Sequence, residues 1–192
     1  MGASDNKLDI DYIELAVQIN QARAKDIYSA IVNEPFKNKV AMARLFLGFI
    51  CIFIVDEKDN AIWLKGVSDT EEYRLAVKQF EFKPTSYRLD FNKNKDNTIV
   101  QTIIQAKPQR TLDWAALNRG QTPTDTVRLN QASSGIASTM LYPLSSVVRG
   151  ALMYNYYQYP EKIGPLQQTF MEDYTKLVSA CLAEHKISPI EW

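Results

Sequence analysis

The stretch STMLYPLSSVVRGALMYNYYQYP, residues 138–160, decides the fold, because it predicts two strands that lead into the last helix. Aromatic and β-branched residues alternate on either side of a break at Pro143 to Val147, which is typical of strands at 136–143 and 148–157. A long amphipathic helix over 164–187 follows. Four tyrosines near the end of the second strand could line a ligand site or merely fill a half-buried sheet: Tyr154, Tyr156, Tyr157 and Tyr159.

An apolar hairpin lies earlier in the chain. GFICIFIVD (48–56) is β-branched and aromatic, EKDN supplies a turn, and AIWLKGV (61–67) returns. Two successive strands joined by so short a turn are antiparallel.

Two helices are predicted before this hairpin. Apolar residues recur at three- and four-residue spacing over 9–35, which predicts one long helix, and a short helix follows over 36–46. It stays open whether apolar residues of the terminal helices face the sheet or a partner. The stripe of the first helix consists of Ile13, Val17, Asn20, Ala24, Ile27 and Ile31.

The middle of the chain is a mixed insertion of short elements and polar loops. Its predicted parts are helices at 68–80 and 96–108, an edge strand at 109–114, and a loop with a helical segment that ends near Gly135.

This order of elements predicts an α+β domain with a central antiparallel sheet of about five to six strands. We expect the N- and C-terminal helices to pack on one face of the sheet and the insertion to cover the other. The predicted organisation is a flexible N-terminus (1–8), a single domain (9–187) and a short tail (188–192).

Composition excludes several classes of protein. Lys plus Arg equals Asp plus Glu at 22 each, and no basic block occurs, so we expect no nucleic-acid partner. The longest apolar run, 45–55, is about half the ~20 residues of a membrane helix, so we expect no membrane partner and a cytoplasmic location. Cys51 and Cys181 match no metal or redox spacing and are expected to be buried thiols.

Several segments together resemble a GAF domain, with a PAS-type sensor fold as the main competitor. The resemblance is carried by ARLFLGFICIFIVDEKDNAIWLKGV, by PQRTLDW, and by the closing run IASTMLYPLSSVVRGALMYNYYQYPEKIGPLQQTFMEDYTKLVSACLA. It spans about residues 10 to 185. It implies a regulatory module that holds a small molecule between sheet and insertion and dimerises through its terminal helices.

The ligand classes of that family can be compared with this sequence. Bilin binding needs a cysteine in the insertion, and 68–135 contains neither cysteine nor histidine. His185, the only histidine, is at the far end of the last helix, which disfavours haem. The family's methionine sulfoxide reductases use clustered cysteines, which this chain lacks, and the cyclic-nucleotide pattern is matched only in scattered pieces. We therefore expect no cofactor, no metal and no catalysis.

The candidate ligand-binding residues are polar groups set among aromatic rings near the insertion. Strand alternation separates two faces of the closing strands, and we place Tyr142 and Tyr154 toward the insertion. The alternative is that these rings only fill a second core. The full candidate set is Tyr87, Arg110, Asp113, Trp114, Arg128, Tyr142 and Tyr154.

The leading hypothesis is a GAF-like sensory or regulatory domain that forms a homodimer and takes a small organic ligand. One alternative is a structural or protein-interaction module with a filled pocket, which a small cavity beneath the insertion would favour. A GAF-type reductase is a further alternative, which the positions of the cysteines disfavour.

Overall fold

The structure is a computed structural model that describes residues 8–78, 86–119, 121–145 and 147–185. Nearly all of the predicted N-terminus (1–8) and the predicted tail (188–192) lie outside the described residues.

The core of the fold is one six-stranded sheet in the order β3-β2-β1-β6-β5-β4, in which every neighbouring pair is antiparallel. The predicted hairpin forms its centre together with β6, and the sheet confirms the expected strand number and direction. The strands are β1 Leu47–Asp56, β2 Ala61–Val67, β3 Arg88–Asp90, β4 Gln109–Thr111, β5 Ser138–Pro143 and β6 Gly150–Tyr156.

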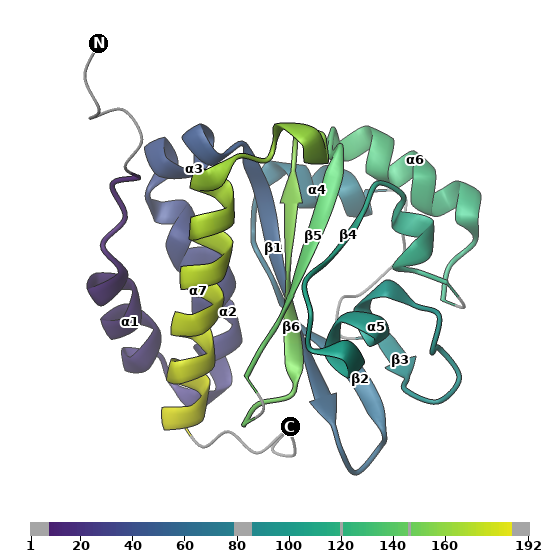
Figure 1. Ribbon diagram of the computed structural model, residues 1–192, viewed down its shortest axis with the longest axis horizontal. Coiled ribbons are helices and arrows are strands. Elements are labelled where there is room, and N and C mark those ends of the chain that lie inside the picture. The colour runs from purple at the N-terminus through teal and green to yellow at the C-terminus, as the bar shows by residue number, and fades with distance from the viewer. Residues whose placement is uncertain (1–7, 79–85, 120, 146, 186–192) are drawn as a thin grey trace.

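Helices cover both faces of the sheet, in three layers (Figure 1). The N- and C-terminal helices share one face and the insertion covers the other, as predicted. The terminal layer contains α1 Tyr12–Gln21, α2 Ile27–Asn33, α3 Lys39–Leu45 and α7 Pro165–Glu184, with the 3-10 turns η1 Ala24–Asp26, η2 Glu34–Lys37 and η5 Pro160–Lys162. The insertion contains α4 Glu71–Val77, α5 Thr98–Gln105, η4 Trp114–Ala116 and α6 Thr124–Ser134.

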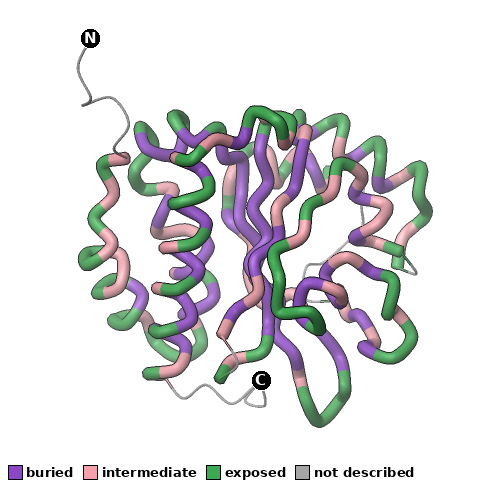
Figure 2. The backbone as a smooth tube through the Cα atoms, viewed as in Figure 1, coloured by how far each residue is buried: buried purple, intermediate pink, exposed green. Residues whose placement is uncertain are grey.

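Strand β1 builds both cores, since its side chains point alternately to the two faces. Ile50, Ile52 and Ile54 enter the core beneath the terminal helices. Phe49 and Phe53 enter the core beneath the insertion. Figure 2 shows this strand buried along its length between the two helical layers.

The N-terminal region differs from the single long helix predicted over 9–35. Helix α1 ends at Gln21 because Ala22 and Arg23 adopt extended backbone angles, and α2 starts again at Ile27. Of the apolar residues in these two helices, Ile19 and Ile27 are buried, whereas Ile13 and Val17 are exposed. Of the two orientations left open for the stripe, its α1 part does not face the sheet, since Ile13 is 78% and Val17 45% exposed.

The insertion contains one strand that we did not predict. Arg88 to Asp90, which the sequence suggested to be irregular, pairs with β2 at the sheet edge. Helix α4 is shorter than predicted and is capped by Thr70. Ser68, the first residue of the predicted helix, lies outside α4 and donates its hydroxyl proton to the Val32 carbonyl at 2.6 Å, which joins the end of β2 to α2.

Candidate functional site: an aromatic cavity beneath the insertion

A cavity of about 80 Å³ lies between the sheet and the insertion. Its floor comes from β1, β2 and β6, and its walls come from α4, α5 and the segment from η4 to α6. The described lining consists of Phe49, Cys51, Phe53, Leu64, Val67, Tyr73, Ala76, Val77, Tyr87, Ile99, Trp114, Leu117, Asn118, Thr122 and Met153.

Ring contacts set the shape of the aromatic walls. Phe49 lies edge-on to Tyr73 and to Trp114, with ring centroids 5.7 and 5.9 Å apart. Phe53 meets Tyr87 in the same manner at 5.7 Å. Such edge-to-face pairs are the geometry that aromatic quadrupoles favour, so the walls are well ordered by their own packing.

The carbonyl of Leu117 fixes a second wall. It accepts a hydrogen bond from the Tyr87 hydroxyl and another from the Asn97 side-chain amide, each at 2.6 Å. The Asn97 side-chain oxygen accepts from the backbone N–H of Ile99 at 2.9 Å and thereby caps α5. One buried asparagine thus positions both α5 and the cavity wall.

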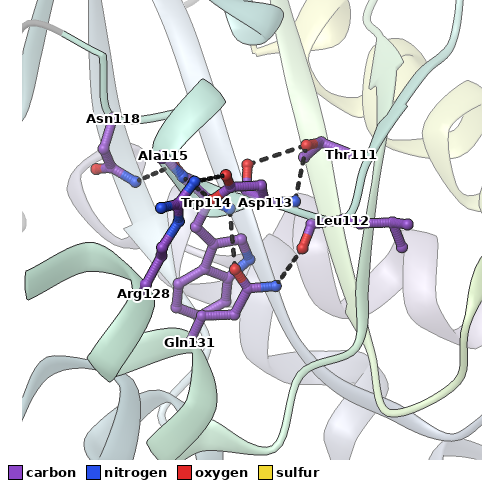
Figure 3. Close-up of polar contacts among 8 residues, drawn as sticks. All are labelled: Thr111, Leu112, Asp113, Trp114, Ala115, Asn118, Arg128 and Gln131. Carbon is purple, nitrogen blue, oxygen red and sulfur yellow. Dashed lines mark hydrogen bonds and ion pairs between the residues drawn. The ribbon is translucent and has the colours of Figure 1, made fainter. Parts of the chain in front are cut away.

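Trp114 is positioned by hydrogen bonds from Gln131 of α6 and from Asn118 in the loop after η4 (Figure 3). Its backbone N–H donates to the Gln131 side chain at 2.9 Å, and Gln131 in turn donates to the Leu112 carbonyl at 2.8 Å. Its backbone carbonyl accepts from the Asn118 side chain at 3.0 Å. Because α6 and the loop after η4 both hold its backbone, Trp114 has little freedom to leave the wall.

The Trp114 indole also begins a buried polar chain across the sheet. Its Nε1–H donates to Thr139 Oγ1 at 2.9 Å, and that hydroxyl donates to Asn155 Oδ1 at 2.7 Å. The Asn155 amide then donates to the Phe49 carbonyl at 3.3 Å. The chain joins Trp114 in the cavity wall to Phe49 in the floor through β5 and β6.

Two predicted site residues, Asp113 and Arg128, pair with each other outside the cavity. Their ion pair is 2.7 Å long, and their side chains are 42% and 59% exposed (Figure 3). The Arg128 hydrogen bond, followed by the Ala115 backbone N–H, holds the pKa of Asp113 below its ordinary value. This pair secures the loop that carries Trp114, and it does not line the cavity.

Of the other predicted site residues, two line the cavity and one lies on the sheet edge, while Tyr142 and Tyr154 lie on the other face of the sheet. Tyr87 and Trp114 line the cavity. Arg110 is exposed on the edge strand β4 and is not part of the described lining.

Tyr142 and Tyr154 lie on the opposite face from the one we expected. Both rings belong to the core beneath the terminal helices, edge-on to each other with centroids 5.9 Å apart. The Tyr154 hydroxyl forms a hydrogen bond with Thr175 Oγ1 of α7 at 2.8 Å, which satisfies the buried phenol. Alternation separated the two faces correctly, but the face that holds these tyrosines is the terminal-helix face, so the prediction is wrong.

The main floor residues, Phe49, Cys51 and Phe53, were not among the predicted site residues. Their spacing of two residues along β1 is a signal that they share one face. Since β1 is apolar on both faces, that signal could not tell which face borders a cavity.

No ionised side chain is present in the described lining. Burial raises the pKa of the Cys51 thiol and of the Tyr73 and Tyr87 phenols, so all three stay protonated at neutral pH. Cys51 is therefore no thiolate nucleophile. Cys181, also buried as expected, belongs to the core on the other face of the sheet, so the two sulfurs form no redox pair.

Within the described part of the chain, no three His, Cys, Asp or Glu residues group closely enough to hold a metal ion. Among the same residues, no helix has the length and apolar character needed to cross a membrane.

Comparison with known proteins identifies the fold. No family model matches the sequence, and no curated protein does. Several solved structures match, of which residues 122 to 287 of a methyl-accepting chemotaxis protein give a TM-score of 0.59 at 11% identity, over 92% of this chain and 99% of that one. The GAF domain of an Acinetobacter phosphoenolpyruvate-protein phosphotransferase gives 0.57 at 11% identity, over 94% and 95%.

Free methionine-R-sulfoxide reductase from Neisseria meningitidis, in complex with its substrate, is a similar structure of a different kind. It gives a TM-score of 0.53 at 15% identity, over 95% of this chain and 99% of that one. Part of a chemotaxis protein, a GAF domain of a phosphotransferase and a reductase thus share this architecture, and architecture alone does not assign an activity. What these structures and the antiparallel six-stranded sheet establish together is that the chain has a GAF-like fold.

Proposed function

We propose that the chain is a non-catalytic regulatory domain that binds a small organic molecule in the cavity beneath the insertion and dimerises through its terminal helices. The observation that supports ligand binding is the aromatic cavity itself, which lies between ordered walls on the insertion side of the sheet. Ligand sites are typically apolar concavities with a few placed polar groups.

The size of the cavity sets a condition on this function. Its volume of about 80 Å³ is well below the roughly 300–1,000 Å³ of drug-sized ligand sites. A ligand must therefore displace a wall when it binds. A ligand that prefers the displaced arrangement shifts the population toward it, which is how binding becomes a signal.

Dimerisation is supported by the outer side of α1. Ile13 and Val17 lie one turn apart and are the exposed apolar residues of that helix. We expect Ile13→Glu with Val17→Glu to convert a dimer into a folded monomer in sedimentation. Val40→Glu is the matched control, because Val40 is 73% exposed on α3 and should leave the dimer intact. A wild-type monomer at high micromolar concentration would remove this part of the proposal.

The second candidate is a protein-interaction module whose pocket is filled by its own side chains. The small cavity volume favours it. A screen of nucleotides, amino acids and aromatic metabolites by thermal shift separates the two, since a ligand raises the melting temperature by mass action. The regulatory proposal requires a ligand whose effect is lost in Ala76→Leu, which fills the cavity from α4. If the screen finds no such ligand, the interaction module is the function that remains.

A reductase is the least supported function. It would need thiol chemistry, and the single thiol in the described cavity lining is the protonated Cys51. Thiol-dependent reduction of methionine sulfoxide that disappears in Cys51→Ser would overturn the non-catalytic assignment.

A further inference from the structure

We propose that the ligand of this cavity is an uncharged, mainly apolar ring compound that carries about one hydrogen-bonding group. This inference rests on the proposed ligand-binding function and specifies the chemical class of the ligand.

The described cavity lining contains no charged side chain that could neutralise an ionic ligand. No Asp, Glu, Lys, Arg or His is present among the described lining residues. Asp113, next to Trp114 in the chain, is neutralised by Arg128 in an ion pair that is exposed on the outside of the loop. Against the described lining residues, a carboxylate, phosphate or ammonium group would lose its hydration without gaining a charged partner, which strongly disfavours binding of ions there.

The walls explain why a ring is favoured. Phe49, Phe53, Tyr73, Tyr87 and Trp114 present ring edges and faces to the same space. Planar aromatic molecules pack against such rings at offset or perpendicular angles. Met153 on β6 adds a flexible thioether to the floor, and methionine adapts readily to ligands of different outline.

Polar atoms in the lining are few. The Tyr87 hydroxyl and the Trp114 indole N–H already hold the walls through Leu117 and Thr139. The Asn118 side chain likewise donates to the Trp114 carbonyl, and Tyr73 and Thr122 add further hydroxyl groups to the described lining. These groups suit a single hydroxyl or amide on the ligand and offer no set of donors that would satisfy a phosphate or an amino acid.

Three probes of similar size test the class directly: benzyl alcohol, benzoate and benzylamine. They differ mainly in charge, since at neutral pH the first is neutral, the second an anion and the third a cation. The protein is labelled with 13C at its methionine methyl groups. The Met153 methyl reports on the cavity, and the Met171 methyl, buried beneath the terminal helices, reports on the other face of the sheet. Met153→Leu assigns the signal.

We expect benzyl alcohol to shift the Met153 signal in a saturable titration and to leave Met171 less affected. Benzoate and benzylamine should bind at least about 100-fold more weakly, because each loses its hydration without a countercharge. Ala76→Leu should abolish the benzyl alcohol response. Ala132→Leu is the matched control, since Ala132 is exposed on α6 and outside the described lining, and it should retain the response.

Two results would overturn the inference, and they separate it from the proposed function. Equal binding of a charged probe, lost in Ala76→Leu, would refute the neutral class and leave the cavity as a ligand site. Failure of all three probes to shift Met153 would refute the neutral class and also favour the filled-pocket module over the sensor.

Discussion

Replacement of Thr139 by valine tests whether the buried polar chain holds the cavity wall. Valine has nearly the shape of threonine but removes the hydroxyl that bonds both Trp114 Nε1 and Asn155 Oδ1. Each buried group that loses its partner costs about 1–3 kcal/mol. The expected loss in the free energy of unfolding is therefore about 3 kcal/mol, allowing for partial relaxation.

Thr139→Ser is the matched control, because serine keeps the hydroxyl and loses only a methyl group. It should cost about 1 kcal/mol, the value of one buried methyl group. Urea denaturation at constant m-value measures both variants. Trp114 emission, recorded after Trp63 and Trp192 are replaced by phenylalanine, should change in the valine variant and much less in the serine variant. If valine destabilises the protein no more than serine does, the hydroxyl contributes nothing and the reasoning fails.

Three further predictions concern stability and reactivity. Cys51 should resist iodoacetamide at pH 8 in the folded protein, since burial raises the pKa of its thiol, and should react only after denaturation; rapid labelling of the native protein would contradict this. Asp113→Asn should cost up to about 1 kcal/mol at pH 7, because the ion pair with Arg128 is exposed to solvent. The folded-state pKa of Asp113 is lowered, so this stabilisation is present above the unfolded value of about 4 and is lost as pH falls through the lower folded value. A stability gap to the variant that does not shrink on acidification would refute the assignment. Asn97→Ala should lower the free energy of unfolding by about 2–3 kcal/mol in urea denaturation, because it removes a helix cap and a buried donor. Asn38→Ala, which removes an exposed cap on α3, should lower it by about 1 kcal/mol. Equal losses would show that burial is irrelevant here.

Much of the fold could be predicted from local patterns in the sequence. The apolar runs at 48–56 and 61–67, with a short turn between them, required an antiparallel pair, and β1 and β2 form it. The closing strands and the last helix also lie where the alternation and the helical spacing placed them. These features depend on residues close in the chain, so periodicity and turn chemistry suffice to find them.

The candidate site could be predicted only in part. Tyr87 and Trp114 do line the cavity, whereas Asp113 and Arg128 pair outside it and Tyr142 lies on the other face. Alternation shows that two sets of side chains are separated by the sheet, but both faces are apolar here. Which layer covers which set depends on the path of the chain over the sheet.

The sequence by itself determined the kinds of element, their order and the antiparallel direction of the central strands, because each follows from short-range geometry. Tertiary structure alone decided that Phe49 and Cys51 border a cavity and that Tyr154 bonds with Thr175. It also decided that α1 turns Ile13 outward. The physical reason is that a break of a few residues, or a choice between two apolar faces, changes little in local energy and is settled only when distant segments pack.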